Sequence, residues 1–227
     1  MKAKKLLAVL VATGAVFFGQ AAISEANMWD TYYEHHRNDY ESLKKQANDI
    51  LYYKRYKEAM NIYLDLLKWG SGKNEAYYLY VQIGRCWNGL EGYNKAIEYY
   101  NKSINIRTNY AEAYFYRGVA YKNLGKYNFA IADYNKALEI NPYYSDAYFG
   151  RAWAYEKNKK YHEAIADYTK VIELKFEPYV AYNNRGWNYE KLKQYDQALK
   201  DYQKAVEIKP NYEIAKSNLN RLLKKMK

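Results

Sequence analysis

The chain has 227 residues, of which 49% are hydrophobic and 27% charged, and its formal net charge is +11. This share of apolar residues is sufficient for a packed core, so we do not expect a disordered chain. One cysteine and three histidines rule out a disulfide framework and disfavour a zinc cluster. Only three prolines are present, which favours helices over a loop-rich or all-β fold.

Residues 1–26 are typical of a secretory signal peptide. Three lysines within the first five residues precede an apolar stretch over 6–18, and small residues at Ser24 and Ala26 provide a cleavage site. The alternative is an uncleaved membrane anchor, although the apolar stretch is shorter than the roughly 20 residues that a spanning helix needs. We therefore expect a periplasmic or secreted protein, which contacts a membrane only if this segment is retained. Cleavage removes three lysines and Glu25 and lowers the net charge to +9, because 33 basic residues then face 24 acidic ones.

Residues 27–39 precede the first regular segment and are expected to form either an N-terminal cap helix or an arm. The sequence does not decide between the two. This segment contains Glu34, His35 and His36, the one cluster of metal-ligating residue types that we considered. It lacks further ligands, and we predict no metal site there.

From residue 40 onward the sequence contains five consecutive copies of one repeat. Three copies of 34 residues follow one another without gaps at 111–144, 145–178 and 179–212. A fourth copy spans 77–110, and a weaker first copy spans 40–76, where an insertion at 69–73 is expected to form a loop. Residues 213–227 restart the first half of a sixth copy and are expected to form a capping helix.

The spacing of residues within each copy predicts two helices. Aromatic and small residues recur at positions 4, 8 and 11 of the copy, and again at positions 20, 24 and 27, so each set lies on one face of a helix. Small residues at positions 8 and 20 allow the two backbones to approach closely. Position 24 is tyrosine in all five copies, namely Tyr63, Tyr100, Tyr134, Tyr168 and Tyr202. One helix pair cannot bury both of its faces, so neighbouring copies must stack.

The repeated motif is Tyr-x-x-Arg-Gly-x-x-Tyr, then Leu-Gly-x-Tyr-x-x-Ala, then proline. It resembles the tetratricopeptide repeat family over residues 40–212. The resemblance implies an all-α solenoid of about five helix–turn–helix repeats, stacked into a right-handed superhelix. It also implies a non-catalytic scaffold that binds a protein or peptide in a concave groove. The alternative is a structural spacer or accessory subunit of a cell-envelope complex, because this fold is shared by proteins with different partners.

The resemblance also suggests which residues contact a partner. In this family the concave wall is formed by the first helices, at positions that include 5, 9, 12 and 13. The residues of this chain that we predict to bind a partner there are Phe115, Phe149, Trp153, Trp187, Arg85, Lys122, Lys157 and Lys191. Tryptophan at position 9 is the least expected of them, and its alternative role is core packing.

A carboxylate clamp of the kind that holds the acidic C-termini of chaperones is not expected. Lys44 and Asn48 match its pattern and Gln82 nearly does, but Glu112 and Tyr116 replace two of its basic residues.

Arginine and aspartate occur together in the last three copies. Position 7 is Arg117, Arg151 and Arg185, and position 23 of the same copies is Asp133, Asp167 and Asp201, whereas the first two copies have neither. In an antiparallel helix pair these positions lie close together. We predict a partly buried ion pair in each of the three copies, within the repeat or to its neighbour, and the alternative is that the arginines bind an anionic ligand.

No catalytic set of residues is visible, so we expect neither an enzyme nor a cofactor. The sequence has no nucleophile with an adjacent base, no glycine-rich phosphate loop and no Cys-x-x-Cys motif. Cys86 occupies a position that is alanine in later copies and is interpreted as a small core residue, with a reactive thiol as the alternative. Lysines are interspersed with glutamates, as in Glu98 and Lys102, and no nucleic-acid partner is expected.

Overall fold

The computed structural model describes residues 38–68 and 75–227. The predicted signal peptide, residues 27–37 of the predicted arm with its two histidines, and the predicted loop at 69–73 lie outside the described residues. The chain divides into two units, 1–46 and 47–227. In the first unit residues 38–46 are helical, and Lys44 Nζ lies 2.8 Å from a carboxylate oxygen of Glu41.

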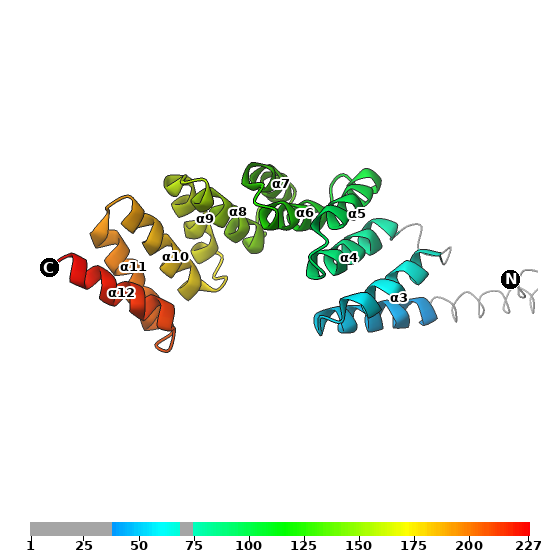
Figure 1. Ribbon diagram of the computed structural model, residues 1–227, viewed down its shortest axis with the longest axis horizontal. Coiled ribbons are helices and arrows are strands. Elements are labelled where there is room, and N and C mark those ends of the chain that lie inside the picture. The colour runs from blue at the N-terminus through cyan, green and yellow to red at the C-terminus, as the bar shows by residue number, and fades with distance from the viewer. Residues whose placement is uncertain (1–37, 69–74) are drawn as a thin grey trace, which may run out of the picture. The chain divides into compact units, whose positions relative to one another are not determined.

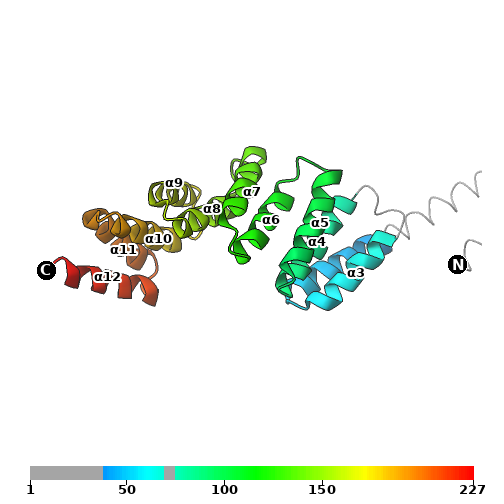
Figure 2. The same ribbon diagram turned by 45° about the horizontal axis from the view of Figure 1, so that its top comes forward.

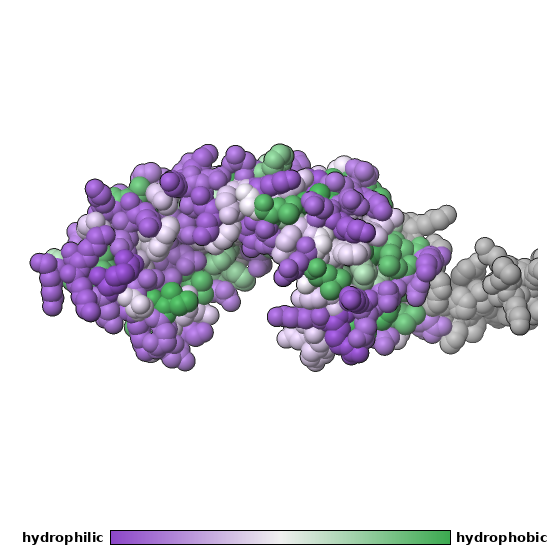
Figure 3. Space-filling view, viewed as in Figure 1, coloured by the Kyte–Doolittle hydropathy of each residue, from purple (hydrophilic) through white to green (hydrophobic). Residues whose placement is uncertain are grey.

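In the described residues of the larger unit, every regular element is a helix. Residues 47–52 are helical, and the labelled helices follow them in chain order (Figures 1 and 2). Their bounds are α3 Tyr56–Lys68, α4 Ala76–Gly89, α5 Tyr93–Ile106, α6 Ala111–Asn123, α7 Tyr127–Ile140, α8 Ser145–Lys157, α9 Tyr161–Glu173, α10 Pro178–Lys191, α11 Tyr195–Ile208 and α12 Glu213–Lys225. Most of the visible surface is hydrophilic, and apolar side chains form scattered patches (Figure 3).

Helices pair in the order that the repeats predicted. Each of α4, α6, α8 and α10 packs against the helix that follows it, and each second helix also packs against the first helix of the next pair. α12 packs against α11 and α10 at the end of the row. The prediction of an all-α fold with about five helix–turn–helix repeats and a capping helix is confirmed. No helix among the described residues has the length and apolar character needed to cross a lipid bilayer.

The turn inside each repeat contains one residue in the left-handed backbone region. These residues all stand at position 15 of the repeat, with φ between 58° and 72°, and they are Lys54, Glu91, Gly125, Lys159 and Lys193. A left-handed residue after a helix ends it and allows the chain to reverse direction. Glycine adopts this conformation without a steric penalty, yet only Gly125 is glycine.

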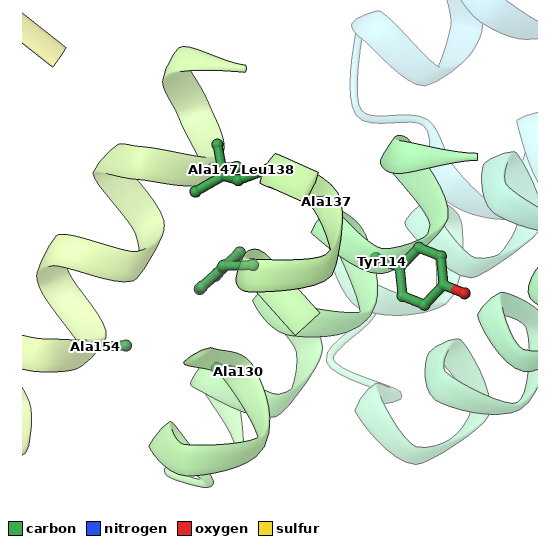
Figure 4. Packing of buried hydrophobic residues seen from close by; sticks show 7 residues of the cluster. Tyr114, Ala130, Ala137, Leu138, Ala147 and Ala154 are labelled. Atoms are coloured by element: carbon green, nitrogen blue, oxygen red, sulfur yellow. The ribbon is translucent and has the colours of Figure 1, made fainter. Parts of the chain in front are cut away.

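The core is assembled from small residues and the position-24 tyrosines. All five of these tyrosines are fully buried, as are the alanines at position 20. The ring of Tyr134 lies so close to two glycines that an added Cβ would meet it at 2.9 Å from Gly118 and 2.8 Å from Gly150. Figure 4 shows the neighbouring apolar cluster between α6, α7 and α8, in which Ala137 and Leu138 pack close to Ala147.

The hydroxyl groups of these buried tyrosines have different surroundings. Tyr63 donates to Asn48 Oδ1 at 2.7 Å, and Tyr202 donates to Glu190 Oε2 at 3.2 Å. Among the described residues, the hydroxyls of Tyr100 and Tyr134 have no hydrogen-bond partner. Burial raises the pKa of both groups above the ordinary tyrosine value, so they stay protonated.

We expect this difference to be measurable in paired substitutions. Tyr202→Phe should lower the free energy of unfolding by about 1.5–3 kcal/mol, because it removes a hydrogen bond to the charged Glu190. Tyr134→Phe should leave the free energy of unfolding unchanged or raise it, because its hydroxyl is buried without a partner. Urea unfolding followed by circular dichroism measures both. An equal loss in the two variants would contradict the prediction and indicate a buried water at Tyr134.

Candidate functional site

The structure brings each of the three predicted arginines to the predicted aspartate of its own repeat. Arg117 on α6 donates from Nε and Nη2 to the two carboxylate oxygens of Asp133 on α7, at 2.8 and 2.6 Å. The Arg151–Asp167 and Arg185–Asp201 pairs have the same two-bond geometry, with distances between 2.7 and 2.8 Å. All three aspartates are 5% exposed, so these pairs are largely shielded from water.

The third donor of each arginine reaches the preceding repeat. The Nη1 groups donate to residues at position 25 of that repeat, at 2.6 to 2.9 Å, and the acceptors are Asn101, Asn135 and Thr169. Each guanidinium therefore links two helices of its own repeat to the second helix of the repeat before it. Because all three nitrogens of each guanidinium donate within the stack, these arginines join neighbouring repeats.

Burial and ion pairing shift the pKa values of these charged groups in opposite directions. Burial raises the pKa of Asp133 above its ordinary value, and the Arg117 guanidinium opposes that rise. Burial alone would lower the pKa of Arg117, but the hydrogen bonds and charge of Asp133 outweigh it and raise that pKa. The two-bond contact between guanidinium and carboxylate thus offsets part of the cost of burying the aspartate.

Removing one partner of a buried arginine–aspartate pair should lower the free energy of unfolding. We expect Asp167→Ala to lower the free energy of unfolding by about 3–5 kcal/mol, reduced somewhat by the partial exposure of Arg151, because an unpaired guanidinium is left in a buried site. Lys170→Ala breaks the exposed Lys170–Glu173 pair on the same helix and should have little effect. Chemical unfolding of both variants measures the difference. Similar midpoints would contradict the role of the buried pair.

A cleft opens on the face of the larger unit that is formed by residues 47–52, α4 and α6. Its volume is about 370 Å³. The lining residues are largely aromatic and polar, and they are Asn48, Leu51, Tyr52, Tyr78, Val81, Gln82, Arg85, Tyr110, Glu112 and Tyr116. A second hollow of about 300 Å³ shares Arg85 and Tyr116 with the cleft and extends to Lys54 in the neighbouring turn.

Arg85 lies in the wall between these two hollows, with its guanidinium held in place. Its Nη1 donates to the buried Gln82 Oε1 at 2.7 Å, and its Cζ lies 4.8 Å from the ring centre of Tyr116. No acceptor among the described residues takes a hydrogen bond from Nε or Nη2. These two groups form the edge that the other three arginines use to bind aspartate. Arg85 is thus arranged to receive a carboxylate in the same two-bond geometry.

Four tyrosines contribute to the lining of the cleft. Asn48 Oδ1 accepts hydrogen bonds from the hydroxyls of Tyr63 and Tyr78, at 2.7 and 2.8 Å, and so fixes the wall opposite Arg85. Tyr52 is 80% exposed at the entrance. Burial raises the pKa of Tyr116, and this hydroxyl stays a neutral donor. Such rings offer large contact areas together with hydrogen-bonding groups, a combination common in protein recognition sites.

The other predicted partner-binding residues lie along the following first helices. Trp153 on α8 and Trp187 on α10 are half-buried, and each packs edge-on against a tyrosine of the preceding repeat, at ring-centre distances of 5.7 and 6.1 Å. Lys157 Nζ lies 4.9 Å from the Trp153 ring and Lys191 Nζ lies 4.5 Å from the Trp187 ring. Lys122 Nζ also lies 5.4 Å from Trp153, and burial lowers its pKa.

Phe115 and Phe149 lie closer to the core. The ring of Phe115 contacts Tyr144 at 4.8 Å and Tyr134 at 5.9 Å between ring centres, and Phe149 contacts Tyr168 at 5.5 Å. Of the eight predicted residues, Arg85 lines the cleft. Cys86 beside it is buried, and burial raises the pKa of its thiol to about 12, so the sulfur is an unreactive protonated thiol at neutral pH.

The sequence reasoning did not identify the tyrosine walls or Gln82 as a site. Tyr78 and Gln82 stand at positions 2 and 6 of their repeat, and Tyr116 stands at position 6 of the next. Both positions follow the same helix face as position 9. A comparison of position 6 across the repeats would have shown a glutamine and a tyrosine next to Arg85.

Comparisons with known proteins agree with this architecture. The tetratricopeptide repeat profile matches residues 111–144, 145–176 and 179–212, and a TPR repeat profile matches 91–125. The crystal structure of MamA is 27% identical, with a TM-score of 0.63, over 71% of this chain and 92% of that chain. No curated protein sequence matches this chain.

Two further solved structures share the fold at 20% identity. A tetratricopeptide repeat protein from Parabacteroides merdae matches with a TM-score of 0.68 over 82% of this chain and 73% of that chain. YrrB, described as a TPR protein with an unusual peptide-binding site, matches with a TM-score of 0.63 over 82% of this chain and 94% of that chain.

Proposed function

This chain belongs to the tetratricopeptide repeat family, and we propose that it is a non-catalytic scaffold that binds an extended protein segment in the cleft around Arg85. The observation that supports this most directly is the guanidinium of Arg85, which Gln82 and Tyr116 hold with two donors directed to no protein group among the described residues. An acidic side chain or a C-terminal carboxylate of a partner would accept both bonds.

The shape and lining of the cleft suit a peptide. Its tyrosine rings provide contact area for side chains, while the hydroxyls and Asn48 provide hydrogen-bonding groups for a main chain. Because α4 packs against α6 and α6 packs against α8, a bound segment can continue from the cleft along these first helices toward α10. Trp153 and Trp187 lie on that path, in keeping with their predicted role.

We also propose, from residues 1–26, that the protein acts after export. Its partner would then be a protein of the cell envelope or of the surroundings. In the alternative proposal the solenoid is a spacer within an envelope complex, and the cleft carries no peptide.

Site-specific photocrosslinking in intact producing cells separates these proposals. A benzoylphenylalanine in place of Tyr52 is at the cleft entrance, whereas the same group in place of Tyr143 is in the turn between α7 and α8. The two side chains are equally exposed, at 80% and 79%. We expect a discrete adduct from position 52 and none of the same mass from position 143.

Arg85→Gln should then reduce the yield of this adduct by about tenfold or more, since hydrogen bonds to a charged group contribute about 1.5–3 kcal/mol. Unchanged helical content, checked by circular dichroism, shows that the variant is folded. Equal adducts from both positions in a large complex would favour the spacer. An adduct that is insensitive to Arg85→Gln would overturn the role of the cleft.

A further inference from the structure

Lysines gather on one edge of the larger unit. The turns inside successive repeats lie along this edge, and the turns between repeats lie along the opposite edge, because each repeat is an antiparallel helix pair. We call seven lysines in or next to the turns after α6, α8 and α10 the basic rim. They are Lys122, Lys126, Lys157, Lys159, Lys160, Lys191 and Lys193.

The charge of the basic rim is not neutralised by ion pairs. Among the described residues, none of the seven lysines has a carboxylate within 4.0 Å. Of the nearby carboxylates, Glu190 pairs with Arg221, whereas Glu156 accepts a hydrogen bond from the neutral Asn188 and its charge acts on Lys157 and Lys191. Glu163 and Asp196 remain, so positive charge is in excess along this edge.

Lysines on the second helices show the opposite arrangement. Lys136, Lys170 and Lys204 stand at the same position of three repeats, and each pairs with a glutamate three residues later at 2.6 to 2.8 Å. These three lysines are therefore locally neutralised, while those of the basic rim are not.

Two rim lysines occupy an unfavourable backbone conformation. Lys159 has φ 58° and Lys193 has φ 60°, whereas the equivalent residue of the repeat before them is Gly125. Glycine suits this left-handed position better than a residue with a Cβ. Lys54 and Glu91 adopt the same conformation, so it belongs to the turn of the repeat, and lysine at the two rim sites fits this turn less well than glycine would.

The tryptophans beside the rim hold the lysines and are not open for stacking. Lys157 lies over Trp153 and Lys191 over Trp187, while tyrosines contact the ring edges. A single-stranded nucleic acid would need exposed ring faces to stack its bases. A ligand of this rim is thus recognised by its negative charge, which favours an acidic polypeptide over a nucleic acid.

We infer that the basic rim binds an acidic, extended segment of the protein partner that the cleft takes, an inference that rests on the proposed function. The two surfaces face the same edge of the stack: Lys54 lines the hollow next to Arg85 and occupies the same left-handed turn position as Lys159 and Lys193, with Glu91 at that position of the second repeat. At moderate salt, opposite charges attract each other over distances up to about 10 Å. Several rim lysines therefore act together on one acidic segment.

A fluorescein-labelled oligoglutamate peptide is the probe, and fluorescence anisotropy with the full chain is the measurement. The triple variant Lys159→Gln, Lys160→Gln, Lys193→Gln removes three rim charges. Its matched control, Lys136→Gln, Lys170→Gln, Lys204→Gln, removes three charges from the second helices. We expect the rim variant to bind about tenfold more weakly, from three ion pairs of roughly 0.5 kcal/mol each, and the control to bind like the unmodified protein.

Several outcomes would overturn the inference. Equal losses in the two variants would mean that binding follows net charge alone. Tighter binding of a single-stranded DNA oligonucleotide, or of phosphatidylglycerol vesicles, than of oligoglutamate would mean that the rim serves another class of ligand.

Glycine variants give a second test, because they remove the charge of the rim lysines without lowering the stability of the turn. Lys159→Gly and Lys193→Gly together should keep or raise the thermal midpoint, because glycine suits the left-handed turn, and should still weaken oligoglutamate binding several-fold. Unchanged binding would count against the rim. The cleft proposal is tested separately by the crosslinked adduct at position 52. The rim variants leave Arg85 and its neighbours unchanged, so the two proposals can fail independently.

Discussion

Contact between a buried tyrosine ring and two glycines sets how the repeats stack. Tyr134 packs on Gly118 of its own repeat and on Gly150 of the next, and a Cβ at either glycine would collide with the ring. This close approach fixes the separation of neighbouring first helices, and it places them side by side. In the preceding repeat the ring of Tyr100 approaches Gly84 of α4 in the same way, and α4 carries the central wall of the cleft. The burial of an unpartnered hydroxyl is offset by the packing of the ring.

Arginine serves two purposes in this chain, and the helix position decides which. At position 7 its side chain is directed to the second helix of its own repeat, where an aspartate accepts from two guanidinium nitrogens, and a residue of the preceding repeat accepts from the third. Position 9 is two residues further on, so its side chain is rotated by about 200° around the helix. Arg85 at that position is in the cleft, with an amide oxygen on one nitrogen and no carboxylate partner among the described residues. The same side-chain chemistry therefore stabilises the stack at one position and is available to a ligand at the other.

The fold and the arginine–aspartate pairs followed from features that recur with the repeat. Tyrosine recurs at position 24 of all five repeats, and paired charges recur at positions 7 and 23 of the last three. They recur because they make the same packing contacts in each repeat. The cleft was missed because it is made of residues that do not recur. Position 6 is Gln82, Tyr116, Gly150 and Asn184 in successive repeats, so averaging over repeats conceals what stands beside Arg85. The bridging acceptors Asn101, Asn135 and Thr169 were missed for a related reason, because amide and hydroxyl groups share the position without sharing a residue type.

The separation between recurring and variable positions explains how a stack of this kind can carry a binding surface. In a solenoid each repeat contacts only its neighbours, so stability is close to a sum of local terms. Substitutions at the position-24 tyrosines or at the buried aspartates act directly on those terms. Substitutions at Arg85 and at the lysines of positions 13 and 15 act on side chains that face outward, whereas Gly150 at position 6 is tied to the packing of Tyr134. The left-handed turn position illustrates this variability, since it holds lysine, glutamate or glycine in repeats with the same fold. Charge can therefore be concentrated on one edge while the helix pairs keep a common core.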